Sequence, residues 1–420
     1  MLKKLLMVAA PAAFIALGVG EASQAATFQV LASGLDSPRG LTFGPDGALY
    51  VTEAGRGGTG PCIPAPGSGP DGPIVCYGPT GAVTRIQNGT QERIVTGLPS
   101  IALPIPEFSI TVDATGPHDI QFDSTGKPYV VLGLGSSPEQ RDEVLQIPEF
   151  GQLIAIDNLN GEASWTRLAD LAAYEGLYNP DRLGSGFYNP YNNGIDSNPY
   201  ALLIQDDTAY IVDAAGNDFF QVKTDGSGLE LLSVFPERPV ADPITGQTIG
   251  MQSVPTAIAT GPDGAFYIGE FTGFPYPEKA ARIFRLDSDN QPVLYADGFT
   301  QIIDLAFDNE GGLYVLEFAS ESLFSGGFTS PGTLIYLDPN GTRTTIASDG
   351  LISPTALEVG PDGAIYVSNR GFIPGQGQVV RISVPEPTST LGLLAFGVFG
   401  TASCLLHKQK SANPVKNRVG

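Results

Sequence analysis

Apolar and polar positions alternate along most of this chain in short runs, which are paired around glycine-rich turns. In SPRGLTFGPDGALYVTEAG (Ser37–Gly55), Leu41 and Phe43 flank Thr42 before the turn Gly-Pro-Asp-Gly, and the same alternation resumes after it. A period of two around such a turn predicts a tight antiparallel hairpin.

This hairpin pattern occurs six times, and the copies differ in how well they are preserved. The copies span residues 37–55, 116–135, 198–216, 254–273, 301–320 and 353–371. A repeated unit of this kind cannot bury its apolar faces alone, so neighbouring copies must pack against each other. The repeat therefore predicts one domain rather than several independent ones.

A third alternating run follows every copy, and a fourth follows all except the last. The missing run is supplied by TFQVLAS (Thr27–Ser33), which precedes the first copy. Four antiparallel strands per repeat are typical of a propeller blade. We therefore expect an all-β fold, a six-bladed β-propeller over residues 27–383 that an N-terminal strand closes, because closure removes exposed sheet edges.

The composition fits this fold and restricts the partners. The 420 residues include 53 glycines and 35 prolines, and the net charge is −22. The termini contain six of the 22 basic residues but only two of the 44 acidic residues, so the intervening domain is more acidic than the whole chain. Such a charge repels nucleic acid and anionic membranes, and it favours cations, cationic partners and neutral ligands.

Residues 1–26 have the features of a signal peptide. Lys3 and Lys4 precede the apolar run Leu5–Val19, and small residues end the segment at Ala25 and Ala26. A transmembrane anchor is the alternative, but the run is short. Export permits disulfides.

Cys62 and Cys76 lie in one loop of the first repeat, and we expect them to pair; two free thiols are the alternative. Cys404 lies in the apolar C-terminal segment, where we expect no disulfide.

Residues 384–420 begin with Val-Pro-Glu-Pro, continue with the apolar run Leu391–Leu406 and end in a basic tail. This segment resembles the PEP-CTERM sorting signal of exopolysaccharide-producing bacteria and cyanobacteria. The resemblance implies processing by exosortase-type sorting machinery after transient membrane anchoring by a transmembrane helix. A plain C-terminal anchor is the alternative, since the length and the flanking charge suit either.

Long loops are expected on one face of the propeller, because they join second to third strands or one repeat to the next. Because the long loops share one face, a binding role is favoured over the alternative that they are insertions without a function. Two rings of side chains are expected to open on this face. The first, where inner strands begin, contains Arg39, His118, Tyr200, Thr256, Ile303 and Thr355, and we take it, Ile303 excepted, as a ligand-binding ring.

The second ring, where second strands end, contains Glu53, Leu132, Asp213, Glu270, Glu317 and Asn369. Four carboxylates and an amide around a channel suit Ca²⁺, which prefers oxygen ligands, so Ca²⁺ is the candidate cofactor. The alternative is that each acid caps backbone N–H groups of the next blade. His118 is either a hydrogen-bonded structural group or a general base.

The loop at 174–200 is rich in tyrosine and asparagine. Tyr188 and Tyr191 offer flat rings to a sugar or an aromatic ligand, or else they form the loop's own small core. The chain has no G-x-S-x-G, H-E-x-x-H, phosphate-loop or dinucleotide motif. One histidine in the repeats makes a Ser-His-Asp or multi-histidine site difficult to assemble.

The repeats, together with GPHDIQF and DSNPYALL, resemble the ScyD/ScyE family of exported propellers, named for genes beside the biosynthetic cluster of the cyanobacterial pigment scytonemin. NHL-repeat and gluconolactonase-like propellers share the hairpin motif. Membership implies a role near an extracytoplasmic pigment or polysaccharide, and it transfers no catalytic mechanism.

Our leading hypothesis is a non-catalytic binding or scaffold propeller of the cell surface or extracellular matrix, with a small-molecule, pigment or glycan ligand and no nucleic acid. The alternative is a metal-dependent lactonase-like hydrolase or pigment-tailoring enzyme that acts at the axial channel. It would bind its metal through the second ring and use His118 or Glu53 as base. The absence of a second histidine and the presence of Leu132 in the ring weigh against this alternative.

Overall fold

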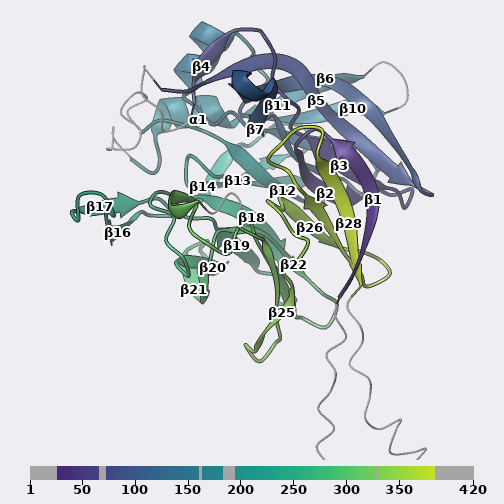
Figure 1. Cartoon of the computed structure of the whole chain (residues 1–420), viewed down its shortest axis with the longest axis vertical. Helices are drawn as coiled ribbons and strands as arrows, with labels where there is room; N and C mark the ends of the chain where they lie inside the picture. Colours follow the sequence, from purple (N-terminus) through teal and green to yellow (C-terminus); the bar gives the residue numbers. More distant parts are fainter. Residues whose placement is uncertain (1–25, 66–71, 160–162, 183–193, 327–329, 384–420) are drawn as a thin grey trace, which may run out of the picture. The chain divides into compact units, whose positions relative to one another are not determined.

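The computed structural model describes residues 26–65, 72–159, 163–182, 194–326 and 330–383 (Figure 1). Over these residues the chain is an all-β protein of antiparallel sheets. The described strands form six sheets of at least four strands and one separate hairpin. Residues 1–25 of the predicted signal peptide and the whole predicted sorting segment, residues 384–420, lie outside the described residues.

The first three sheets follow the order of the chain. The first contains β2 (Pro38–Phe43), β3 (Leu49–Glu53), β5 (Ile74–Gln87) and β6 (Thr90–Ile105), to which β4 (Cys62–Pro64) and β7 (Ile110–Thr115) add. The second contains β8 (Pro117–Phe122), β9 (Pro128–Leu132), β10 (Gln152–Asn158) and β11 (Ser164–Asp170). The third contains β12 (Pro199–Gln205), β13 (Thr208–Asp213), β14 (Asp218–Lys223) and β15 (Glu230–Val234).

The remaining sheets repeat this order, and a separate hairpin precedes them. The hairpin is β16 (Arg238–Ala241) and β17 (Thr248–Met251). The fourth sheet contains β18 (Pro255–Thr260), β19 (Phe266–Glu270), β20 (Ala281–Leu286) and β21 (Pro292–Phe299). The fifth contains β22 (Ile302–Phe307), β23 (Leu313–Glu317), β24 (Thr333–Leu337) and β25 (Arg343–Ala347). The sixth contains β26 (Ala356–Val359), β27 (Ile365–Asn369), β28 (Gly377–Ser383) and β1 (Thr27–Leu35).

The N-terminal strand completes the last sheet, as predicted. β1 pairs antiparallel with β28, from Thr27 opposite Ser383 to Leu35 opposite Gly377. Figure 1 shows this pair as a purple strand beside a yellow-green one. The first strands of successive sheets also contact each other in a closed cycle, from β2 through β8, β12, β18, β22 and β26 back to β2. This cyclic arrangement is consistent with a propeller.

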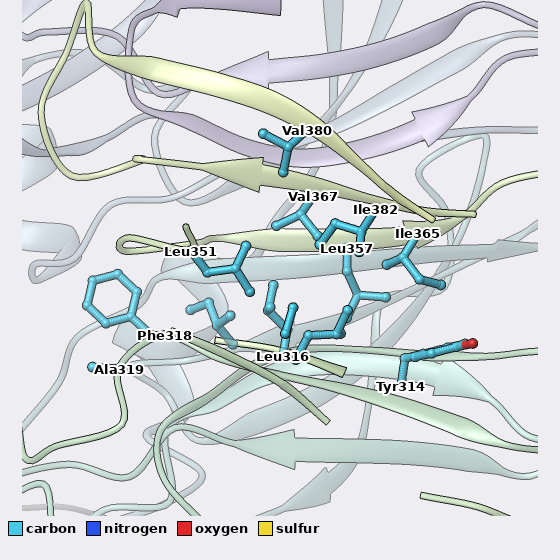
Figure 2. Close-up of a cluster of buried hydrophobic side chains, with 13 residues drawn as sticks. Tyr314, Leu316, Phe318, Ala319, Leu351, Leu357, Ile365, Val367, Val380 and Ile382 are labelled. Atoms are coloured by element: carbon cyan, nitrogen blue, oxygen red, sulfur yellow. The ribbon is translucent and has the colours of Figure 1, made fainter. Parts of the chain in front are cut away.

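The hydrophobic core lies mainly between neighbouring sheets. In Figure 2, Val367 and Ile382 of the sixth sheet face Leu316 of the fifth, and all three side chains are fully buried. Burying one such aliphatic side chain stabilises the fold by roughly 1.5–3 kcal/mol. Because every sheet has apolar residues on both faces, each needs two neighbours, and a closed ring supplies them.

The Gly-Pro-Asp-Gly turns have a local reason for their sequence. Gly47 adopts a φ of 74° and its N–H donates to the carbonyl of Gly44 at 2.9 Å. The Asp46 carboxylate accepts from the N–H of Ala48 and from the hydroxyl of Tyr50. A left-handed glycine and an aspartate that bonds to its own turn explain this motif.

The long connections contain elements that the hairpin pattern did not reveal. These are β4, β7, the hairpin β16–β17, helix α1 (Leu171–Tyr178) and three short helical turns, η1 (Pro106–Phe108), η2 (Gln140–Leu145) and η3 (Leu323–Ser325). All lie between second and third strands or between sheets. Antiparallel strand order places these connections at one end of the sheets, as predicted.

The predicted disulfide is confirmed, because Cys62 and Cys76 are bonded and face each other across β4 and β5. It secures the connection that leads from β3 to β5. None of the helices in the described ranges is long and apolar enough to cross a membrane. The apolar run Leu391–Leu406, for which a transmembrane helix is predicted, is not among them.

Candidate functional site

The first strands of the sheets enclose an axial cavity of about 320 Å³. At the starts of these strands His118 and Thr355 are buried, whereas Phe307 and Val359 at the other ends are half-buried. All four side chains line the cavity. The cavity is therefore more accessible from the end with the short hairpin turns than from the end with the long connections.

The first predicted ring does begin the inner strands, and all of its members except Arg39 line the cavity, although most of them are buried. Tyr200 is half-buried, and the other members are buried: Arg39, His118, Thr256, Ile303 and Thr355. The Arg39 guanidinium donates to the carbonyl oxygens of Ala114, at 2.7 Å, and Gly371, at 3.3 Å. Arg39 thus joins two connections at the channel end, and it does not line the cavity.

His118 is held as a neutral, hydrogen-bonded group. Its Nδ1 lies 3.0 Å from the carbonyl oxygen of Pro199, and because a carbonyl only accepts, Nδ1 donates. The ring lies 4.8 Å from that of Tyr200. Burial, with a smaller contribution from the Arg39 charge, lowers the pKa of His118 to about 3. These contacts support the structural role for His118 rather than that of a general base.

The ring threonines link neighbouring inner strands. The hydroxyl of Thr256 donates to the carbonyl of Ile302 and that of Thr355 to the carbonyl of Pro38, both at 2.7 Å. Their side chains line the cavity, but their donor protons are already used. The first ring therefore contributes more to closing the propeller than to recognising a ligand.

The second predicted ring is used in a different way from the one expected for metal ligands. Each of three side chains accepts a hydrogen bond from the segment that leads into its own sheet: Glu53 from the N–H of Asp36, Glu317 from that of Thr300 and Asn369 from that of Ile352, at 2.6–2.8 Å. Asp213 likewise accepts from the N–H of Asn198, and Glu270 from the hydroxyl of Ser253. The acids therefore act as caps, on their own sheet rather than on the next one.

Arginines neutralise two of these acids. Arg93 donates to both oxygens of Glu53, and Arg238 and Arg282 donate to Glu270. Over the described residues, no group of three or more His, Cys, Asp or Glu side chains is placed to hold a metal ion. The ring of Glu53, Asp213, Glu270, Glu317 and Asn369 does not fit Ca²⁺, because each of the five side chains already accepts a hydrogen bond through a side-chain oxygen.

Three other acids, which the repeat pattern did not indicate, line the cavity. Asp119 and Asp304 take the same position in β8 and β22, and Glu358 lies in β26. Asp119 accepts from the N–H groups of Ile120 and Leu202, both at 2.8 Å. Asp304 accepts in the same way from those of Leu305 and Leu357. Each aspartate thus bridges its own sheet and the next one.

The cavity environment favours the protonated form of these carboxyl groups. Burial raises the pKa of Asp304 to about 7. Burial, together with the charge of Asp304, raises that of Glu358 to about 8. The pKa of Asp119 is also well above its ordinary value, chiefly through burial. Acids of this kind in a water-accessible cavity are candidates for ligand contacts.

A sequence signal for Asp119 and Asp304 exists in retrospect. Four copies of the repeat have glycine or alanine at this position, namely Gly40, Ala201, Ala257 and Ala356, whereas the second and fifth copies have aspartate. Tyr188 and Tyr191, the predicted aromatic ligand contacts, lie outside the described residues.

Comparison with known proteins gives structural likeness and no family. No family model matches the chain, and no curated protein matches it. Solved structures that resemble it include the soluble aldose sugar dehydrogenase of Escherichia coli, at 12% identity and a TM-score of 0.49, which covers 86% of this chain and 100% of that one.

Two further neighbours are a gluconolactonase of Xanthomonas campestris and the calcium-binding protein regucalcin of Agrobacterium tumefaciens. The first has 10% identity and a TM-score of 0.46, and covers 86% of this chain and 90% of that one. The second has 13% identity and a TM-score of 0.47, and the match covers 86% of this chain and 94% of regucalcin. At identities of 10–13% and TM-scores of 0.46–0.49, these similarities assign neither a family nor a function to this chain.

Proposed function

We propose that this chain is a non-catalytic binding protein, a six-bladed propeller that holds a small neutral or cationic ligand in its axial cavity. The observation that supports this best is that Asp119, Asp304 and Glu358 line a water-accessible cavity. Carboxyl groups that are partly protonated near neutral pH both donate and accept hydrogen bonds, which suits a hydroxylated ligand. The net charge of −22 disfavours anions.

The rest of the lining favours a ligand with an apolar face. Leu203, Ile258 and Phe307 lie in the same cavity as the acids. A volume of about 320 Å³ is at the lower end of the range for small-molecule sites. A sugar unit or a small aromatic precursor of a pigment combines the required hydroxyl groups with flat apolar surfaces.

The proposed setting is the cell surface or extracellular matrix. It rests on the signal-like residues 1–26 and on the resemblance of residues 384–420 to a PEP-CTERM segment, and the ScyD/ScyE resemblance adds a link to scytonemin-type pigment or exopolysaccharide. Fractionation of cells that express the full chain, with N-terminal sequencing of the product, tests this proposal. A full-length, unprocessed protein in the cytoplasm would contradict it.

Binding is tested by titrating the purified full-length chain with neutral sugars, polyols and aromatic phenols in a calorimeter. The variant Ala306→Phe fills the cavity and should weaken binding at least tenfold, because Ala306 lines it. Asp225→Asn, in an exposed turn, is the matched control and should bind normally. If no such compound binds the wild-type chain, or if Ala306→Phe binds as well as wild type, the cavity is not the binding site.

A second candidate, lactonase-like or pigment-tailoring catalysis, is favoured by one observation. Asp304 has a pKa of about 7 in an accessible cavity, which suits a general acid or base at neutral pH. The second predicted ring, which contains Glu53 and Glu270, does not fit a metal ion. In this reaction the carboxyl groups of the cavity would therefore act as the acid and the base. Turnover of neutral lactones or esters that disappears in Asp304→Asn would favour catalysis, and binding without turnover would favour the first proposal.

A further inference from the structure

A second acidic cluster lies outside the axial cavity, between helix α1 and the third sheet. Glu175 of α1 is 1% exposed and Asp218, the first residue of β14, is fully buried. Within the described part of the chain, no donor from another residue contacts any of their four carboxylate oxygens, and the two carboxyl groups lie within hydrogen-bonding reach of each other. Buried carboxylates without donors are costly, so this pair requires an explanation.

The two carboxylates converge on one point beside Gly216. A methyl group placed on Gly216 would lie 3.3 Å from Oε2 of Glu175 and 3.4 Å from Oδ2 of Asp218. The same point lies 3.4 Å from the carboxyl carbon of Asp213. Glycine at this position therefore lets both carboxylates lie close to the backbone, because a methyl group there would be in tight contact with them.

The surroundings of this pair are acidic. The charged groups that act most strongly on both side chains are Asp181 and Asp213, and the pair members themselves. Burial and this repulsion raise the pKa values of both Glu175 and Asp218. Glu270, a buried acid on β19, instead has two arginines as partners. Asp213, a buried acid beside the pair, accepts hydrogen bonds from Ser197 and Asn198. The other buried acids of this region thus have donors, whereas no such donor reaches Glu175 or Asp218 within the described residues.

We propose that Glu175 and Asp218 bind one Ca²⁺ ion beside Gly216. Among the described residues no three ligating acidic, histidine or cysteine side chains come together. This is compatible with a site of two carboxylates, because Ca²⁺ completes its shell with carbonyl oxygens, amide oxygens and water. Asp181 is half-buried and accepts a hydrogen bond from the Asn217 side chain at 2.9 Å, and its negative charge would attract the ion. Asp213 adds negative charge while its own oxygens stay bound to Ser197, Asn198 and the following turn.

Charge favours Ca²⁺ over a single shared proton. One proton would leave a net negative charge on the buried Glu175–Asp218 pair, whereas a divalent ion offsets both carboxylates. Mg²⁺ requires near-ideal octahedral geometry, and two carboxylates from a helix and a strand are better matched to the irregular shell of Ca²⁺.

The ion would fasten helix α1 to the third sheet. The ring of Tyr174 on α1 already lies 5.1 Å from that of Phe220 on β14. Bound Ca²⁺ would add a polar link on the adjacent side of the helix, next to this apolar contact. The expected role is structural, and it is independent of whether the axial cavity binds a ligand.

The test uses the full-length chain in mild detergent, freed of metal with EDTA and then dialysed. Titration with CaCl₂ should show one strong site in the calorimeter, at 0.15 M NaCl to suppress loose binding to the acidic surface. At a Ca²⁺ concentration about a hundred times Kd, the melting temperature should rise by about 4 °C. Glu175→Gln, Asp218→Asn and Gly216→Ala should each lose most of this rise, and Mg²⁺ should give a smaller one.

Two controls make the result specific. Glu230→Gln, an exposed acid on β15 of the same sheet, and Glu270→Gln, a buried acid with arginine partners, should both keep the Ca²⁺-dependent rise. A wild-type chain that neither binds Ca²⁺ nor melts higher with it would overturn the proposal and leave a shared proton as the explanation. A rise that survives in Glu175→Gln and Asp218→Asn would place the ion elsewhere.

Discussion

At the scale of single residues, the protein retains buried carboxyl groups in three ways. Arg93 pairs with Glu53, which keeps that charge compensated. Asp304 accepts from two backbone N–H groups and has a pKa near neutrality. Glu175 and Asp218 have neither kind of partner. Whether a buried acid is available for a ligand therefore depends on the partners that offset its charge, rather than on whether it is aspartate or glutamate.

Close packing at Gly40 leads to the first prediction. A Cβ at this position would lie 2.1 Å from Oδ1 of Asp119 and 2.7 Å from its Cα, so the neighbouring strand would have to move. Gly40→Ala should destabilise the fold by about 3 kcal/mol, as overpacking does. Gly47→Ala meets no atom within 4 Å but places alanine at a φ of 74°, which should cost about 1 kcal/mol. Urea unfolding measures both, and equal losses would contradict the contact with Asp119.

Glu358 makes stability depend on pH in a defined direction. The carboxyl has an ordinary pKa of 4.5 and a folded pKa of about 8, raised by burial and by Asp304. Between these values the folded chain holds more protons than the unfolded chain, so rising pH favours unfolding. Glu358→Gln should therefore melt higher than wild type at pH 8.5, by a few degrees, with little difference below pH 4.5. Thermal melts across this range test it, and a difference that grows toward low pH would contradict it.

At the scale of elements, the hairpins could be predicted from the sequence. Which side chains of the inner strands face the cavity could not be predicted. Alternation fixed the strands around each Gly-Pro-Asp-Gly turn. The inner strands, however, carry irregular registers near their starts, between Pro38 and Leu41 and between Pro117 and Asp119. A bulge changes which face the next side chain occupies, so a period of two misplaces the first residues of these strands. This is why Asp119, which lines the cavity together with His118, was not predicted.

Helix α1 and the hairpin β16–β17 were missed for a different reason. Both lie in long connections, where no repeat and no strict alternation guides a prediction. Asp170 caps α1 by accepting from the N–H of Ala173 at 2.8 Å, but one capping residue before eight helical residues is a weak sequence signal. The acids of the calcium proposal come partly from this helix, so the sequence alone did not bring them together.

Ring closure by β1 yields the prediction at this scale. Leu35 is 1% exposed and packs with Leu41 and Val379, whereas Val30 on the same strand is 53% exposed. Leu35→Ala should cost about 3 kcal/mol, and Val30→Ala no more than about 0.5 kcal/mol. Denaturant unfolding of the two variants compares them directly. Similar small losses would mean that β1 contributes little to the last sheet.

At the scale of the whole molecule, acidic charge and cyclic packing have opposite effects on the stability of the folded state. Neighbouring sheets supply each other's apolar surface, which stabilises the ring as a unit. The excess of 44 acidic over 22 basic residues instead raises the energy of the compact state, because like charges are brought together. The buried acids with arginine partners do not relieve this repulsion, since it arises mostly at the surface.

Screening of that surface charge gives the last prediction. Raising NaCl from about 10 mM to about 150 mM shortens the Debye length from about 30 Å to about 8 Å. At pH 8, with EDTA present to exclude divalent ions, the melting temperature should therefore rise by a few degrees. Near pH 4, where the carboxylates approach protonation, the same salt step should have much less effect. A fall in melting temperature with salt at pH 8 would mean that attractive ion pairs such as Arg381–Asp362, rather than net repulsion, dominate the electrostatics of the fold.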